Sequence, residues 1–205
     1  MIKIPVNKDY NGWAKSMITE FDKQKTYNKF KCKNNWLGLL GELYFHRWLN
    51  KQGIEHNWID FYKQSWDEPD FVIYDGTKNK VPIVTIDVKT TFDFKMWIQK
   101  PVVDIYVFLR MNRTEQDKII MVGWLEGKRI QKLIDNNKLE IVERAGRRDF
   151  LIPVNYIRPI ESLSSKLKME VDKYARRKKS KPKDFEVVRP HSTGRATNTF
   201  GVQTR

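Results

Sequence analysis

The chain has 205 residues, of which 40% are hydrophobic and 13% aromatic, a composition typical of a globular protein with one sizeable core. A single cysteine, Cys32, excludes an internal disulfide and a cysteine zinc site. The formal net charge of +14 indicates a polyanionic partner, most commonly nucleic acid, although a lysine-rich composition that only keeps a protein soluble is the alternative. No signal-peptide pattern and no run of eighteen apolar residues occurs, so we expect a soluble intracellular protein without membrane contact.

The first part of the chain predicts two helices. Apolar residues recur at steps of three and four over residues 10–21, which is typical of a short amphipathic helix. A longer helix is predicted over residues 34–53, between an asparagine and a glycine that fit its two caps. This helix is apolar on two sides, so we expect it to be buried, with Gly38 and Gly41 letting another backbone come close. Glu42 lies in the middle of one apolar side.

Short segments rich in β-branched and aromatic residues follow, separated by turn signals. We expect three strands, at residues 56–61, 70–75 and 81–90. Residues 103–111 and 118–126 then predict an antiparallel pair, because a short polar segment joins them.

The last part of the chain changes in composition near residue 165. Before this point, residues 127–137 predict a short surface helix, and residues 148–157 an edge strand whose pairing Pro153 would limit. This order of elements indicates a mixed α/β or α+β sheet domain over residues 1–164. Residues 165–205 hold twelve Lys or Arg against four Asp or Glu, a net charge of +8, which predicts a basic arm, helical at first and then flexible.

Three charged residues interrupt strands that should fill the core: Asp70 begins one, and Asp87 and Lys89 lie in the next. Side chains alternate across a strand, so Asp87 and Lys89 point to one face, and pairing of the two strands places Asp70 beside Asp87. Two adjacent carboxylates repel unless a cation lies between them, and Mg²⁺ or Mn²⁺ prefers oxygen ligands. We therefore expect a divalent metal at Asp70 and Asp87, with the backbone carbonyl of Val88 as a further ligand and Lys89 holding a water or phosphate oxygen. Glu42 is a fourth charged group without an evident role in a core.

These residues follow a characteristic order along the chain: Gly41-Glu42 in a helix, Pro69-Asp70 at a strand start, and Asp87-Val88-Lys89 in the next strand. The order resembles the PD-(D/E)XK nuclease superfamily over about residues 34–91. The resemblance implies a restriction-endonuclease-like α/β/α core, with a short mixed sheet flanked by helices, that cleaves DNA with Mg²⁺ or Mn²⁺. It implies that Asp70 and Asp87 bind the metal, that Lys89 assists the attacking water and that Glu42 supports the metal cluster, also as a ligand. Many members dimerise, which leaves a homodimer open.

The resemblance also bears on the type of nuclease. The exonuclease branch usually carries a Q-x-x-x-Y helix motif soon after the triplet, whereas Gln99 is here followed by Lys100-Pro101-Val102-Val103. We therefore expect an endonuclease. A junction- or structure-selective resolvase and a catalytically inactive nucleic-acid-binding module on the same fold are the alternatives.

Basic side chains near aromatic residues, in a turn and in the arm are candidate contacts with nucleic acid. They are Lys95, Lys100, Arg144, Arg147, Arg148, Arg176, Arg177, Lys178 and Lys179. Solvated loops and turns account equally well for the first five. The run at residues 176–183 also resembles a nuclear localisation signal, so the nucleus is a second location beside the cytoplasm of a bacterium or phage host.

Overall fold

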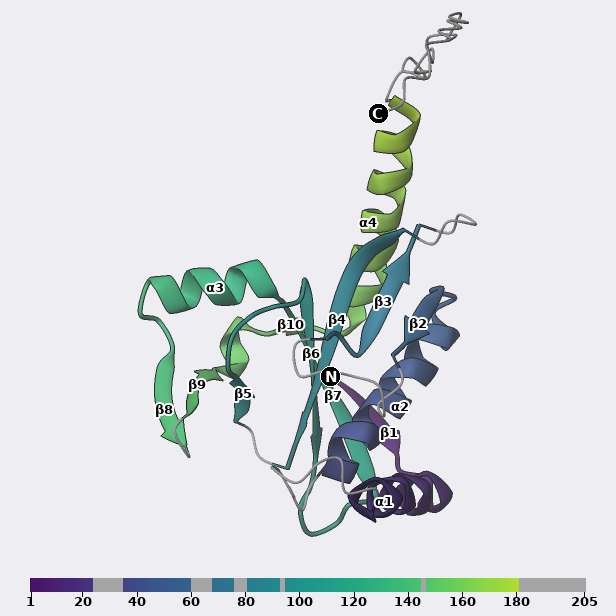
Figure 1. Ribbon diagram of the computed structural model, residues 1–205, viewed down its shortest axis with the longest axis vertical. Helices are drawn as coiled ribbons and strands as arrows, with labels where there is room; N and C mark the ends of the chain where they lie inside the picture. The colour runs from purple at the N-terminus through teal and green to yellow at the C-terminus, as the bar shows by residue number, and fades with distance from the viewer. Residues whose placement is uncertain (24–34, 60–67, 76–80, 93–94, 145–146, 181–205) are drawn as a thin grey trace, which may run out of the picture.

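The computed structural model describes residues 1–23, 35–59, 68–75, 81–92, 95–144 and 147–180 (Figure 1). The helices are α1 (Lys8–Lys23), α2 (Asn35–Lys51), α3 (Gly127–Asp135) and α4 (Glu161–Ser180), with a 3₁₀ turn η1 (Val154–Tyr156). The strands are β1 (Ile2–Pro5), β2 (His56–Trp58), β3 (Phe71–Tyr74), β4 (Pro82–Thr91), β5 (Met96–Ile98), β6 (Ile105–Met111), β7 (Lys118–Glu126), β8 (Glu140–Arg144), β9 (Arg147–Ile152) and β10 (Arg158–Pro159).

The strands form two sheets. The larger sheet has seven strands in the order β1-β7-β6-β4-β3-β2, with β10 also paired to β7. Its β4 and β6 are parallel, and the other pairs are antiparallel. The smaller sheet has three strands in the order β5-β9-β8. The predicted α/β class, a mixed sheet flanked by helices, is confirmed.

Each face of the larger sheet packs against its own hydrophobic core. One core joins the sheet to α1, α2 and α4, through residues such as Phe45 and Leu167, which are both fully buried. The other joins the sheet to the smaller sheet and α3, through residues such as Tyr106 and Ile130. Strand β4 contributes Ile86 and Val88 to the first core, so the side chains between them lie on the second face.

Helix α2 confirms the predicted burial and close approach. A Cβ atom on Gly41 would overlap the Oγ1 atom of Thr90, so glycine here lets α2 pack directly against β4. The same atom on Gly38 would meet open space, so the expectation for this second glycine is wrong. The helix ends at Lys51, and Gly53 follows with a φ of 66°, as its predicted cap role requires.

Residues 148–157 were predicted to form an edge strand; a strand is present there, but it is not at an edge. Strand β9 is the central strand of the smaller sheet, between β5 and β8, and Pro153 comes directly after its last residue, Ile152. A proline after the last paired residue removes no ladder hydrogen bond, so it limits the length of the strand and leaves both of its edges available. Strands β1, β5, β8 and β10 were not expected from the sequence.

Helix α4 starts at Glu161 and runs through residue 165, where the composition changes. Its first half belongs to the core, because Leu163 and Leu167 are fully buried. Its last turns project beyond the ends of β3 and β4 (Figure 1). The division of the chain at residue 165 stays a prediction, and residues 181–205 lie outside the described residues. No helix in the described part of the chain is long and apolar enough to cross a membrane.

Candidate active site

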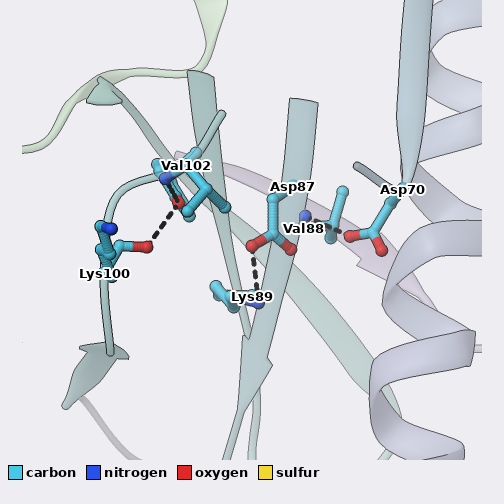
Figure 2. Close-up of polar contacts among 7 residues, drawn as sticks. Asp70, Asp87, Val88, Lys89, Lys100 and Val102 are labelled. Atoms are coloured by element: carbon cyan, nitrogen blue, oxygen red, sulfur yellow. Dashed lines mark hydrogen bonds and ion pairs between the residues drawn. The ribbon is translucent and has the colours of Figure 1, made fainter. Parts of the chain in front are cut away.

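The carboxylate of Asp70 accepts a backbone hydrogen bond from β4 at a point where β3 no longer pairs with this strand. Strand β3 starts at Phe71, which pairs with Ile86, so β4 has no β3 partner beyond this pair. Asp70 directly precedes β3, and its Oδ2 atom accepts the backbone N–H of Val88 at 2.6 Å (Figure 2). The N–H and C=O groups of one strand residue point to the same edge, so the carbonyl of Val88 faces this open edge as well. Asp70 therefore lies next to β4, as the sequence predicts.

Asp87 and Lys89 lie on one face of β4, as the alternation of side chains predicts. The Nζ atom of Lys89 lies 2.6 Å from the Oδ2 atom of Asp87 (Figure 2). The Asp87 side chain is 13% exposed and that of Lys89 is 42% exposed, so the carboxylate is the more sheltered of the two. In the parallel pairing with β6, the two residues lie opposite Tyr106 and Phe108.

Glu42 enters the site from α2. It is 6% exposed, and its Oε2 atom accepts a hydrogen bond from the indole Nε1 of Trp58 at 3.0 Å. The Trp58 ring is stacked on Phe71 and on His46, with ring centroids 5.9 Å and 5.1 Å apart. A buried carboxylate needs such a donor because burial removes its water. Trp58 therefore fixes where Glu42 can point.

Burial and mutual repulsion perturb the protonation of these groups. The pKa of Glu42 is raised from 4.5 to about 7, because burial and the charge of Asp87, which raise it, outweigh the Trp58 hydrogen bond and the charge of Lys89, which lower it. Burial, and then the charges of Glu42 and Asp87, also raise the pKa of Asp70 well above its usual value. Burial lowers the pKa of Lys89, but the carboxylates of Asp87 and Asp70 outweigh this effect and raise it overall. The site thus concentrates more negative charge than one lysine balances.

The donor chemistry of the site fits a hard divalent cation. Asp70, Asp87 and the Val88 carbonyl offer only oxygen atoms. Burial, and then the charges of Glu42 and Asp87, raise the pKa of Asp70, and a cation would offset both effects. No group of three or more His, Cys, Asp or Glu side chains in the described ranges is arranged to hold a metal ion. Mg²⁺ commonly uses only one or two carboxylates and keeps several waters, so a pair of aspartates suits it. Ligand roles for these residues, and for Glu42, stay predictions.

The candidate contacts with nucleic acid lie in three places. Lys95 and Arg148 are exposed on the smaller sheet, where they lie 5.8 Å from the ring centre of Trp97 and 6.0 Å from that of Phe150. Lys100 is exposed in the segment between β5 and β6. On α4, Arg176, Arg177 and Lys178 are exposed. The side chains of Arg144, Arg147 and Lys179 lie outside the described residues.

Lys178 has a partner within the protein, since its Nζ atom lies 3.5 Å from the Oδ2 atom of Asp75. The side chain of Asp75 is only 2% exposed, and its Oδ1 atom accepts the N–H of Val81. Lys178 therefore braces α4 against the β3–β4 connection, so it is less available to a partner than its neighbours on the helix.

The sequence did not reveal the two aromatic residues that support the site, Trp58 and Tyr106. Trp58 lies in a mixed segment and Tyr106 in an apolar one, and only tertiary pairing distinguishes them from core residues. His46, whose spacing from Glu42 suits a metal ligand, is instead hydrogen-bonded through Nδ1 to Nε2 of His56 at 2.8 Å. Histidines on a helix and on the strand that follows it give no pattern that predicts this pair.

Comparisons with known proteins add little to these observations. No protein family matches the chain, and no curated protein is significantly similar to it. Among solved structures, the fold is similar to D212, a nuclease from a fusselovirus, with a TM-score of 0.43 and 18% sequence identity. The alignment covers 66% of this chain and 91% of that chain. A similarity at this level assigns neither a family nor an activity to the present chain.

Proposed function

We propose that the protein is a metal-dependent DNA endonuclease of the PD-(D/E)XK type. The observation that carries the proposal is the meeting of Glu42, Asp70, Asp87 and Lys89, which come from α2, from the residue before β3, and from β4. Charged groups that raise one another's pKa in a sheltered place are costly to the fold, and such clusters occur mainly at functional sites. Their order along the chain resembles the same nuclease type.

Each residue has a role in this proposal. Asp70, Asp87 and the Val88 carbonyl would hold Mg²⁺ or Mn²⁺, with Glu42 supporting them. A bound ion of this kind lowers the pKa of a water and neutralises charge that develops on the phosphate. Lys89 forms an ion pair with Asp87, and its side chain is partly exposed. In this proposal it orients the attacking water or stabilises the transition state electrostatically.

The partner and the mode of cleavage follow from other features. The net charge of +14 and the exposed basic side chains beside the site and on α4 favour a nucleic acid, and DNA is the substrate that the resemblance implies. The segment after Gln99 carries no Q-x-x-x-Y motif, which favours internal cleavage over digestion from an end. A homodimer would place two such sites on one duplex, and light scattering during size-exclusion chromatography measures it.

A substrate panel tests the proposal. Supercoiled plasmid, four-way junctions and linear duplex are incubated with the protein in Mg²⁺, in Mn²⁺, in Ca²⁺ and in EDTA. We expect nicked or linearised circles, or junctions cut internally, in Mg²⁺ only, because Ca²⁺ has a larger radius and looser geometry. Cutting confined to junctions identifies a resolvase, and binding without cutting in Mg²⁺ and Mn²⁺ identifies an inactive module. Mononucleotides released only from linear ends would contradict the endonuclease assignment.

A further inference from the structure

The segment over residues 99–104 connects β5 of the smaller sheet to β6 of the larger sheet. Figure 2 shows Lys100 and Val102 on one side of Asp87, with Asp70 on the other side. This segment, the 99–104 loop, therefore lies on the side of Asp87 opposite Asp70. Its exposed members include Lys100 and Val102, and the latter is 50% exposed.

Tyr106 holds the middle of the 99–104 loop. Its hydroxyl accepts the backbone N–H of Val102 at 2.9 Å and donates to the carbonyl oxygen of Lys100 at 3.3 Å. The residue is 1% exposed and is paired in register with Asp87. One buried side chain thus connects the backbone of Lys100 to the strand position next to the site carboxylate.

The far end of the loop is fixed as well. The Oδ2 atom of Asp104 accepts hydrogen bonds from the backbone N–H and the hydroxyl of Thr85, at 2.9 Å and 2.8 Å. Thr85 precedes Asp87 by two residues on the same face of β4. The loop is therefore tied to β4 through Asp104 and to β6 through Tyr106.

The 99–104 loop carries an exposed positive charge, the ammonium group of Lys100. Lys100 is exposed, and its ammonium group has no ion pair with any carboxylate in the described part of the chain. Burial raises the pKa of Tyr106, and the charge of Asp87 raises it further, so the phenol keeps the proton that it donates to Lys100. The structure thus presents an exposed cation on a fixed backbone, on the side of Asp87 opposite Asp70.

We propose that Tyr106 is a positioning residue, which holds the 99–104 loop so that Lys100 contacts a phosphate of duplex DNA adjacent to the bond cleaved at Asp87. This inference rests on the proposed function. It names a substrate contact on one side of the site and the residue through which that contact is placed. Tyr106 itself acts through Lys100 and does not touch the substrate.

Substitutions of two tyrosines and two lysines test the proposal. Tyr106→Phe removes only the hydroxyl, and Lys100→Gln removes only the charge. The matched control is Tyr44→Phe, since the Tyr44 hydroxyl also accepts a backbone N–H, from Asn7 at 2.8 Å, and donates to a carbonyl, in a residue 4% exposed. Lys3→Gln, on the exposed face of β1, removes the same charge elsewhere.

Affinity for a labelled duplex is measured by fluorescence anisotropy in EDTA at several salt concentrations, and steady-state cleavage in Mg²⁺. We expect Tyr106→Phe and Lys100→Gln each to raise Kd roughly five-fold and to lower the slope of log Kd against log salt by about 0.9, the loss of one phosphate contact. We expect KM to rise by the same factor with kcat nearly unchanged. Tyr44→Phe should lower Tm as much as Tyr106→Phe while leaving Kd unchanged.

The double variant decides whether Tyr106 works through Lys100. If it does, Tyr106→Phe adds no further loss of affinity once Lys100 is glutamine, because coupled residues are not additive. Additive losses, or a Lys100→Gln variant that binds like Lys3→Gln, overturn the inference. So does a wild-type protein that does not bind the duplex.

The two proposals fail in different ways. Binding that weakens as expected in a protein that cuts no DNA overturns the endonuclease and leaves the role of Tyr106 standing. Cleavage in Mg²⁺ with unchanged Kd in both variants does the reverse.

Discussion

Glu42→Gln should make the metal-free protein more stable at alkaline pH. Glutamine has nearly the same shape, and its amide oxygen can still accept the Trp58 hydrogen bond at the position that Oε2 occupies. What it removes is the cost of ionising a carboxyl that is 6% exposed and faces Asp87 and Asp70. The perturbation therefore isolates the electrostatic cost of the site from its packing.

The size of the effect follows from the pKa of Glu42, which rises from 4.5 in the unfolded chain to about 7 in the folded one. Below pH 4.5 the carboxyl is protonated in both states, so this group then favours folding fully. Between pH 4.5 and about 7 the unfolded chain releases the proton first, and the free energy of unfolding falls as the pH rises. At about 1.36 kcal/mol per pH unit, the whole interval is on the order of 3 kcal/mol.

The assay is urea unfolding in EDTA, followed by tryptophan fluorescence at pH 5 and pH 8.5. Over this interval wild type should lose up to about 3 kcal/mol more than Glu42→Gln. Glu115→Gln, at an exposed position of the β6–β7 turn, serves as control and should follow wild type. Parallel pH dependences of wild type and Glu42→Gln would refute the electrostatic reasoning. A chelator is essential, because a bound cation would offset the same repulsion.

Other predictions concern activity, packing and the arm. Asp87→Asn should abolish Mg²⁺-dependent cleavage with the fold intact, since it removes a ligand charge and little volume. Lys89→Ala should reduce cleavage nearly as much, with metal still bound. Wild-type turnover by either purified variant contradicts the site assignment. Gly41→Ala should lower the free energy of unfolding by about 1–3 kcal/mol through overlap with β4, whereas Gly38→Ala, in open space, should raise it by roughly 0.5–1 kcal/mol. Deleting residues 181–205, with a net charge of +3, should lower the salt slope of DNA binding by roughly one to three with the preferred substrate unchanged; an unchanged slope assigns this segment to another partner.

The longer elements could be predicted because local pattern and final environment agree in them. Helix α2 extends over Asn35–Lys51, within the predicted residues 34–53, since its apolar sides and caps are all local signals. The pair β6–β7 was found for the same reason: two apolar runs with a polar turn have little choice of partner. The charged site could be predicted because charges inside such runs conflict with a core.

The short strands and the supporting contacts of the site depend on distant parts of the chain. Strand β5 has three residues, Met96–Ile98, and it is a strand only because β9 lies beside it. Proline at position 153 was correctly taken as a limit to pairing, but it ends β9 and does not place it at an edge. The hydrogen bonds of Trp58 and Tyr106 likewise join residues that come together only when the sheets are complete.

Helix α4 affects the entropy and the heat-capacity change that we expect when the basic arm binds a polyanion. An arm that folds on contact with its partner loses conformational entropy at that moment, and it shows a large negative heat-capacity change. Up to Ser180, α4 is already helical, with Leu167 in the core and Lys178 tied to Asp75. Its exposed cations, Arg176 among them, are therefore ordered before any polyanion arrives. The contribution of α4 to association should be dominated by released counterions, with little heat-capacity change of its own.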